Sequence, residues 1–336
     1  MIVAGAGIIG LSCAWRLARC KIPVTVFDAG EAGAEASWAG AGMLAPGGEM
    51  EEASPLAEMA LSSLEMYPEF VETLREASGV PIDYQRCGAV ELALNEHEAV
   101  ELERRAARQS TIGIRSEPAC HAGSVAARFY PDDALVNPRN VMAALRTACL
   151  RAGVSIHEHE PVVEIFADGS GVRTLRDSYS DDGVLIAAGA WSSALTAGLP
   201  LPAPLPATTP VRGHLIAYQA ETGMLGTILR HQNTYLLQRD SGSLIAGSST
   251  ERVGFDRTID ESVVRAIHAR ASRLMPQLAA MEPVERWNGF RPGIESGVPA
   301  VGRIEGTAIR TAFGHYRNGI LLAPDTARRI ENLVIS

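Results

Sequence analysis

The sequence predicts an α/β protein in which pieces of one α/β layer alternate with strands of an antiparallel sheet. Three observations support this prediction. The 336 residues suffice for about two domains. The chain opens with a strand, a glycine-rich turn and a helix, and a second helix-to-strand unit begins near residue 138. Between and after these units lie short segments rich in β-branched residues, which are typical of strands.

The composition narrows the range of partners and chemistry. The formal net charge of -9 argues against nucleic acid or an anionic membrane as the main partner. No apolar run reaches the ~18 residues of a membrane span. Lys21 is the only lysine, so a Schiff-base cofactor is not expected. The five cysteines have neither disulfide nor metal-ligand spacing, and we expect no metal site and a cytoplasmic location.

A phosphate-binding motif, G-x-G-x-x-G, occupies residues 5–10 between a short strand and a helix that runs to about residue 19. Gly5 permits the tight turn, Gly7 lets the backbone approach a pyrophosphate, and Gly10 lets the helix pack on the strand. A second strand ends at Asp28, where an acid can bind an adenosine ribose. The unit predicts a Rossmann-like dinucleotide-binding domain for either a nicotinamide cofactor or FAD. Its expected contacts are Gly5, Gly7, Ile8, Ile9, Gly10, Asp28 and Ala29.

The remaining elements follow from apolar periodicity and from glycine and proline punctuation. The expected helices are 55 to about 78, about 96–109, 138 to about 152, and about 262–275. The expected strands are 24–27, 88–95, one beginning at 154, one within 182–193, 212–219, 234–240 and 242–249. A crossing between layers is expected at Pro200, Pro202, Pro204, Pro206 and Pro210.

Small residues dominate "EASWAGAGMLAP", residues 35–46. Such a backbone can run close along a long cofactor, with its amides facing the phosphates and the ring system. Together with the opening unit, the segment resembles the D-amino-acid-oxidase family of FAD enzymes, and within it the glycine oxidases of thiamine biosynthesis. The resemblance covers essentially the whole chain and implies FAD as the cofactor. It implies further FAD contacts at Ser37, Ala41, Gly42, Met43, Val162 and Gly189.

The family's layout implies two domains, each assembled from separate pieces of the chain. Residues 1–79, 135–200 and 285–336 would form the Rossmann-like FAD-binding domain. Residues 80–134 and 201–284 would form the substrate domain, an antiparallel β-sheet with helices. No cysteine follows Cys149, so the C-terminal loop offers no thiol for a covalent link, and we expect non-covalent FAD.

The resemblance also implies the catalytic residues. Arg291, in "GFRPG", is expected on a turn stiffened by Pro292, where its planar fork would bind the substrate carboxylate. Tyr235 matches the family's active-site tyrosine, and Thr250 falls near a position that lines the family's pocket. These side chains would hold the substrate Cα–H bond under the flavin N5.

The stretch "GHYRNGILLAP" resembles the family's flavin-contacting loop near the C-terminus. Arg317 within it is a further catalytic candidate. A helix expected to begin at Pro324 would direct its positive end toward flavin N1 and O2. The expected contacts of the loop are His315, Tyr316, Arg317, Asn318, Gly319, Ile320 and Leu321.

These observations predict FAD-dependent oxidation of glycine or another small amino acid or amine, in which an imine hydrolyses and O2 becomes hydrogen peroxide. Within the family, oxidation of sarcosine, a small D-amino acid or a tRNA-borne methylamine stays open, as does a dehydrogenase with another acceptor. From other classes, an NAD-dependent dehydrogenase and a non-catalytic dinucleotide-binding module stay open. The expected partners are a small substrate and O2, and a homo-oligomer is compatible with the sequence.

Overall fold

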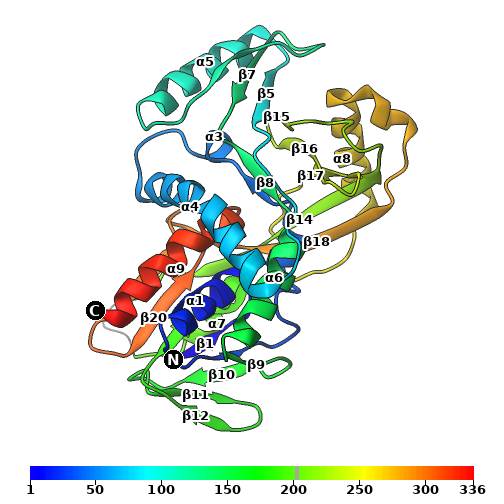
Figure 1. Ribbon diagram of the computed structural model, residues 1–336. Coiled ribbons are helices and arrows are strands. Elements are labelled where there is room, and N and C mark those ends of the chain that lie inside the picture. Colours follow the sequence, from blue (N-terminus) through cyan, green and yellow to red (C-terminus); the bar gives the residue numbers. More distant parts are fainter. Residues whose placement is uncertain (201–203) are drawn as a thin grey trace.

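The computed structural model describes residues 1–200 and 204–336, and its first sheet lies in the lower half of Figure 1. This sheet has six strands in the order β19-β20-β13-β1-β2-β9. The five strands from β20 to β9 run parallel, and β19 pairs antiparallel with β20. The bounds are β1 (Ile2–Ala4), β2 (Thr25–Phe27), β9 (Ser155–His157), β13 (Val184–Ile186), β19 (Ala300–Arg303) and β20 (Ile309–Phe313).

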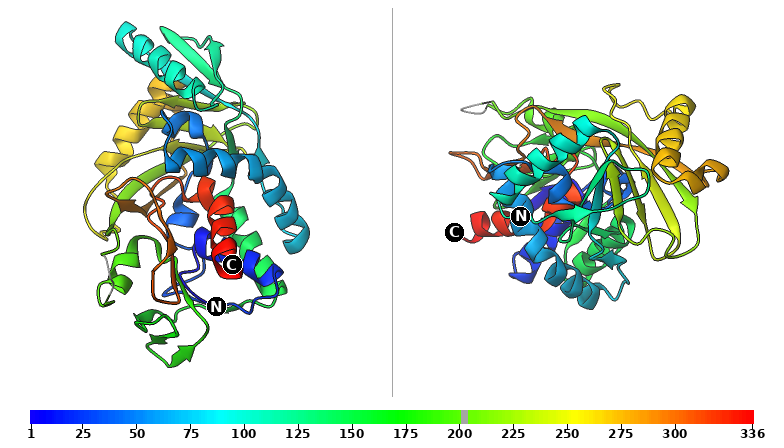
Figure 2. Two further views of the ribbon diagram at one scale, coloured as in Figure 1. Left: turned by 90° about the vertical axis from the view of Figure 1, so that its left-hand side faces the viewer. Right: turned by 90° about the horizontal axis from the view of Figure 1, so that it is seen from above.

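Helices α1, α6 and α9 cover one face of this sheet, and a small three-stranded sheet covers the other face. Helices α1 and α9 pack side by side, and α4 packs against α6 and α9 (Figure 1 and Figure 2). Alternate residues of β1 divide between the two layers, because Val3 joins the core under the helices and Ile2 joins the core under the small sheet. The bounds are α1 (Ile8–Arg19), α4 (Pro55–Ser78), α6 (Pro138–Arg151), α9 (Gly319–Ile335), β10 (Val162–Ile165), β11 (Gly171–Thr174) and β12 (Ser178–Ser180).

The second sheet has eight strands in the order β18-β14-β17-β16-β15-β5-β7-β6, and only the β15–β5 pair is parallel. Helix α8 packs over a separate apolar core on one face of it. The bounds are β5 (Ala89–Ala93), β6 (Glu117–Ala119), β7 (Ala126–Tyr130), β14 (Thr208–Gln219), β15 (Ile228–His231), β16 (Thr234–Gln238), β17 (Ser243–Gly247), β18 (Glu285–Ile294), α5 (Glu96–Ser110) and α8 (Glu261–Leu274).

Short elements connect the two sheets. A three-stranded sheet has the order β3-β8-β4. The remaining bounds are β3 (Met43–Leu44), β4 (Tyr84–Gln85), β8 (Ala134–Val136), α2 (Ala36–Ala39), α3 (Pro46–Glu49), α7 (Ser192–Thr196) and the 3-10 helices η1 (Gly189–Trp191) and η2 (Pro276–Ala280). Within the ranges 1–200 and 204–336, no helix combines the length and the apolar character needed to cross a membrane.

Most expected elements are present, and four expectations need revision. The expected turn around Arg291 is part of strand β18, and this strand belongs to the eight-stranded sheet although 285–336 was expected in the FAD-binding domain. Strand β15 was not expected, and neither were the strands of the two three-stranded sheets or β6, β7, β19 and β20. Pro210 lies within β14 and does not mark the crossing, whereas Pro202 lies outside the described residues. The division into two domains stays a prediction.

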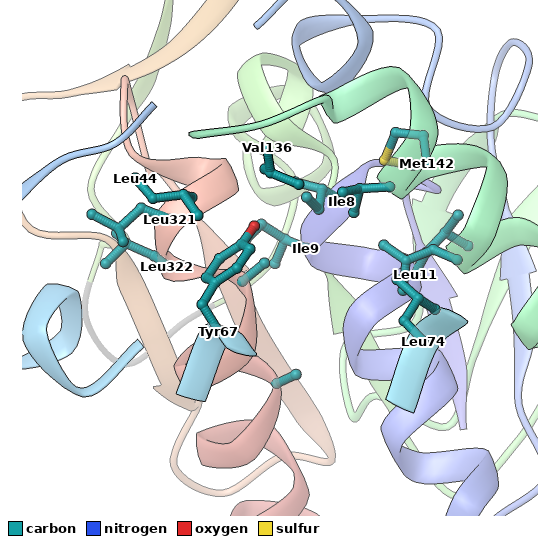
Figure 3. Close-up of a cluster of buried hydrophobic side chains, with 14 of the residues drawn as sticks. Ile8, Ile9, Leu11, Leu44, Tyr67, Leu74, Val136, Met142, Leu321 and Leu322 are labelled. Carbon is teal, nitrogen blue, oxygen red and sulfur yellow. The ribbon is translucent and has the colours of Figure 1, made fainter. Parts of the chain in front are cut away.

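The fourth revision concerns α9, which begins at Gly319 and contains Pro324. Proline inside a helix cannot donate a hydrogen bond to the carbonyl four residues earlier, which here belongs to Ile320. The hydroxyl of Tyr67, from α4, donates to this carbonyl at 2.9 Å and so replaces the missing N–H. Figure 3 shows Tyr67 among the buried side chains beside Leu321 and Leu322. The helix can therefore start one and a half turns earlier than its proline suggests.

Candidate active site

One cavity of about 680 Å³ is bounded by residues of both large sheets. It extends from Asp28, after β2, to Tyr235 in β16 and Arg291 in β18. Its size is within the range of cofactor and small-molecule sites. The residues singled out by the sequence that line this cavity are Gly5, Gly7, Ile8, Ile9, Asp28, Ala29, Ser37, Ala41, Gly42, Met43, Val162, Gly189, Tyr235, Arg291, His315, Tyr316, Arg317, Asn318, Gly319 and Ile320.

Two of the expected contacts, Gly10 and Leu321, lie behind the cavity wall. A Cβ atom on Gly10 would stand 1.9 Å from the carbonyl oxygen of Gly5, so this glycine is needed for close packing of α1. Leu321 is 1% exposed and belongs to the core under the helices. Both residues support the cavity wall by packing behind it, and neither lines the cavity.

The N-terminus of α1 forms one end of the cavity. Gly5 has a φ of 113°, and a Cβ atom there would stand 2.4 Å from the carbonyl oxygen of Ala187, so only glycine fits. Helix α1 has no side-chain cap at Gly7. The N–H of Ile8 donates to Ser37 Oγ at 2.9 Å, which brings the small-residue segment against the helix start. A helix N-terminus with uncapped N–H groups favours a phosphate.

Asp28 stands beside this helix start. Its Oδ2 accepts the N–H of Ala6 at 2.7 Å, and its Oδ1 accepts the N–H of Gly30 at 2.9 Å. Burial raises the pKa of Asp28, the two N–H donors oppose the rise, and the charge of Glu35 adds to it. Each carboxylate oxygen keeps a second lone pair, so Asp28 can hold the turn and still accept a hydrogen bond from a ligand hydroxyl.

The small-residue segment follows the cavity through the short helix α2 and the short strand β3. Gly42 has a φ of 94°, and a Cβ atom there would stand 1.8 Å from a main-chain oxygen of β8. Arg239 donates to the carbonyl of Ala41 at 2.7 Å, and Trp287 donates to the carbonyl of Ala39 at 2.9 Å. Burial lowers the pKa of Arg239 to about 10. Side chains from the second sheet therefore hold this backbone against the cavity.

The C-terminal loop closes the other end. Tyr316 has a φ of 48°, and its N–H donates to the carbonyl of Pro292 at 3.1 Å. The N–H of Asn318 donates to the carbonyl of His315 at 2.9 Å. The first helical bond of α9 runs from the Leu322 N–H to the Asn318 carbonyl, so the N–H groups of the three residues before it have no partner in the helix ladder. This positive end opens on the cavity.

His315 is held in a neutral form. It is 4% exposed, and its Nε2 lies 3.0 Å from Thr326 Oγ1. Burial lowers the pKa of His315 to about 3. At neutral pH the ring therefore carries no charge and is a poor proton acceptor.

Arg291 brings a cation to the cavity. Its Nη1 donates to the Ser249 carbonyl and its Nη2 to Ser248 Oγ, both at 3.0 Å. The guanidinium lies against Gly213, where a Cβ atom would stand 2.1 Å from Nη1. Desolvation lowers the pKa of Arg291. Within residues 1–200 and 204–336, no carboxylate lies at ion-pair distance from this side chain, so its charge is left for a ligand.

Arg317 differs from Arg291, because Glu49 pairs with it at 3.0 Å. Tyr235 is 7% exposed and completes this end of the cavity. Burial raises the pKa of Tyr235, and the charges of the two arginines oppose the rise. Two arginines against one glutamate leave one net positive charge, which suits a ligand with one carboxylate.

Several residues that line the cavity were missed from the sequence: Glu35, Glu49, Trp191, Ser248 and Arg257. The two glutamates flank the small-residue segment, which was a usable signal, whereas Arg257 has no motif of its own. Thr250 needs correction, because it is exposed and does not line the cavity. Ser248, two residues earlier, lines the cavity.

The residues present fit FAD along the whole cavity. Asp28 offers acceptors for ribose hydroxyls, and the N-terminus of α1 offers N–H groups for a pyrophosphate. Further along, the positive end of α9 suits the electron-rich edge of the flavin. Which residues contact FAD stays a prediction.

Comparison with known proteins agrees with this assignment. The chain is similar to a glycine oxidase of Pseudomonas aeruginosa, with 33% identity covering 99% of this chain and 94% of that protein. It is 32% identical to the bifunctional protein ThiO/ThiG of Synechocystis, over 100% of this chain and 51% of that protein. The crystal structure of glycine oxidase from Geobacillus kaustophilus superposes with a TM-score of 0.94 at 32% identity, covering 99% of this chain and 94% of that one.

A family model described as FAD dependent oxidoreductase matches residues 1–333. This match decides between the cofactors and classes that the sequence left open, against a nicotinamide enzyme and against a non-catalytic module. The protein thus belongs to the D-amino-acid-oxidase family of FAD-dependent oxidoreductases.

Proposed function

We propose that this oxidoreductase is a glycine oxidase. The observation that carries the proposal is the guanidinium of Arg291, which lines the cavity without a carboxylate partner in residues 1–200 and 204–336. A planar fork of this kind matches a carboxylate with two parallel hydrogen bonds. The relatives named glycine oxidase support glycine as the amino acid that it receives.

Three side chains have distinct roles in this proposal. Arg291 binds the substrate carboxylate and fixes the direction of the Cα–H bond. Tyr235 donates a further hydrogen bond to the carboxylate, and the raised pKa of its hydroxyl keeps it protonated. Arg317 adds positive charge nearby, and Glu49 holds that guanidinium in place. Orientation of this kind can account for several kcal/mol of the barrier without an acid or a base.

Bound FAD would supply an acceptor for the hydride of the substrate Cα and a route for the two electrons to O2, and the overall reaction would convert glycine, water and O2 to glyoxylate, ammonia and hydrogen peroxide. The N–H groups at the start of α9 would stabilise negative charge on the flavin ring. His315 supports the loop through Thr326 and takes no proton from the substrate, because its pKa of about 3 makes it too weak a base.

An anaerobic mixing experiment tests the proposal. Holoenzyme is mixed without O2 with glycine, sarcosine, D-alanine or methylamine, and the flavin absorbance is recorded. We expect glycine to bleach the flavin fastest and methylamine, which lacks a carboxylate, to leave it unchanged. Air should then restore the colour and yield one peroxide for each glyoxylate.

Other outcomes would lead to other members of the family. If sarcosine or D-alanine bleached the flavin faster than glycine did, that compound would be the preferred substrate. Bleaching that only an artificial acceptor reverses would make the protein a dehydrogenase. A flavin that no amine bleaches would contradict the proposal.

We also propose that FAD is bound without a covalent link and that the enzyme is cytoplasmic. The five cysteines are free thiols, which suits a reducing compartment. None of them lines the cavity. Acid precipitation should release all the flavin into the supernatant, and a yellow pellet would contradict this. Membership in thiamine biosynthesis and a homo-oligomeric state stay predictions.

A further inference from the structure

A loop between β17 and α8, residues 249–260, which we call the strap, lies against the rim of the cavity. Arg212 of β14 fixes it at three places. Its guanidinium pairs with Glu251 at 2.7 Å, pairs with Asp256 at 2.7 Å, and donates to the carbonyl of Thr258 at 3.2 Å. The strap is thus attached along its length to the second sheet.

Two contacts join the strap to residues outside the second sheet that line the cavity. The ring of Phe255 stacks on Trp191, with centroids 4.6 Å apart and planes 17° from parallel. Arg257 forms two hydrogen bonds to the carboxylate of Glu35, at 2.7 and 3.1 Å. Trp191, Glu35 and Arg257 all line the cavity. The ion pair therefore joins the strap to the segment that precedes α2.

The Arg257–Glu35 pair is close to the proposed pyrophosphate position. Glu35 precedes by two residues Ser37, whose Oγ accepts the N–H of Ile8 at the start of α1. The charge of Glu35 also acts on Asp28. A pyrophosphate at this helix start would bring two negative charges near the Glu35 carboxylate, and the repulsion must be offset by a cation. Arg257 is the cation on this rim that already reaches Glu35.

The pair is also exposed enough to rearrange. The side chain of Arg257 is 61% exposed and that of Glu35 is 41% exposed. Ion pairs at this level of exposure contribute little to stability, so opening one costs little. The backbone of Arg257 stays fixed meanwhile, because Asn288 donates to its carbonyl at 3.0 Å. The guanidinium can therefore move while the strap keeps its position.

We propose that Arg257 is an FAD-binding residue, whose guanidinium turns from Glu35 to the pyrophosphate while the strap stays in place and covers the middle of the cofactor. This inference rests on the proposed seating of FAD, with the pyrophosphate at the start of α1, and does not depend on the substrate. Arg257 acts by binding and by covering the cofactor.

Titration of apoprotein with FAD, followed by quenching of flavin fluorescence, tests the inference. We expect Arg257→Gln to raise the FAD dissociation constant about tenfold, the loss typical of one hydrogen bond to a charged group. Arg257→Lys should recover most of that loss, since the charge is kept. Salt should weaken FAD binding less in Arg257→Gln than in the wild type.

The matched control is Arg286→Gln. Arg286 forms a two-contact pair with Glu261 at 3.0 and 2.8 Å, the side chains are 52% and 53% exposed, and neither residue lines the cavity. Its FAD affinity should equal that of the wild type. A melting curve of each apoprotein establishes that the variants are folded.

The variant Glu35→Gln distinguishes two roles of Arg257: binding the pyrophosphate, or only forming the ion pair with Glu35. If Arg257 binds the pyrophosphate, removing the glutamate charge leaves FAD affinity equal or raises it. If the ion pair itself holds the cavity shut, Glu35→Gln weakens FAD as much as Arg257→Gln does, and the inference is overturned. Unchanged affinity in Arg257→Gln overturns it too. Unchanged affinity in Asp28→Ala would instead refute the seating of FAD, so the two failures are distinguishable.

Discussion

Replacing Arg291 by lysine keeps the positive charge but removes the planar fork on which carboxylate recognition is proposed to depend. In the structure, Nη1 reaches the Ser249 carbonyl and Nη2 reaches Ser248 Oγ, each at 3.0 Å. One ammonium nitrogen cannot keep both anchors and also offer two parallel donors to a substrate. One lost hydrogen bond to a charged group costs about 1.5–3 kcal/mol, so kcat/KM should fall about 10- to 150-fold.

The assay is steady-state peroxide production from glycine, normalised to bound flavin. Flavin content should not change, because Arg291 lies at the substrate end of the cavity. Gly213→Ala is a companion variant: its Cβ would stand 2.1 Å from Nη1 and would displace the fork while keeping the arginine. Its kcat/KM should fall by a similar factor, and the kcat/KM of Arg286→Lys should equal that of the wild type. Near-normal kcat/KM in Arg291→Lys would remove this residue from carboxylate recognition.

Three further predictions concern the cofactor and the stability of the fold. Asp28→Ala should weaken FAD binding about 10- to 100-fold in titrations of folded apoprotein and leave turnover per bound flavin normal. Tyr67→Phe should lower the free energy of unfolding by about 1–3 kcal/mol in urea titrations, because it leaves the Ile320 carbonyl without its donor; unchanged stability would show that another group replaces the hydroxyl. Burial lowers the pKa of His315 to about 3 from the 6.5 of an exposed ring, so between these values only the unfolded chain takes up the proton. The free energy of unfolding should therefore decrease as the pH is lowered from 6.5 to 3, by up to about 1.4 kcal/mol per pH unit from this group. The variant His315→Gln should show a flatter dependence of the urea midpoint on pH in this window.

Local signals in the sequence were enough for much of the fold. The helix predicted from Pro55 to about Ser78 is present as α4. Its ends have local signals: Ser54 caps its start through the Ala57 N–H, Pro55 opens it and Gly79 ends it with a φ of 68°. The glycine motif and Asp28 were recognisable because their spacing is set by one strand, one turn and one helix. Each of these features depends on residues close in sequence.

The errors arose where distant contacts decide. "FRPG" suggested a turn at Arg291, but this segment is part of β18, the edge strand of its sheet. An edge strand tolerates a proline such as Pro292, because no further strand on its open side needs the missing N–H as a donor. Pro324 suggested a helix start. The helix can begin earlier because Tyr67, which the packing of α4 brings into place, donates a hydrogen bond to the Ile320 carbonyl. The Arg257–Glu35 pair joins residues 222 positions apart, which no local pattern reveals.

The strand order of the first sheet has a consequence for how the enzyme is made. Strand β1 at residues 2–4 needs β13 at 184–186 as its neighbour, and β13 in turn needs β20 at 309–313. During synthesis β1 can pair early with β2, but its second neighbour, β13, follows only after more than half of the 336 residues, and α9 follows β20. Pairing over such separations is slow, and incomplete chains expose unpaired strand edges. The lining of the cavity can therefore be complete only after residues 312–320 have left the ribosome.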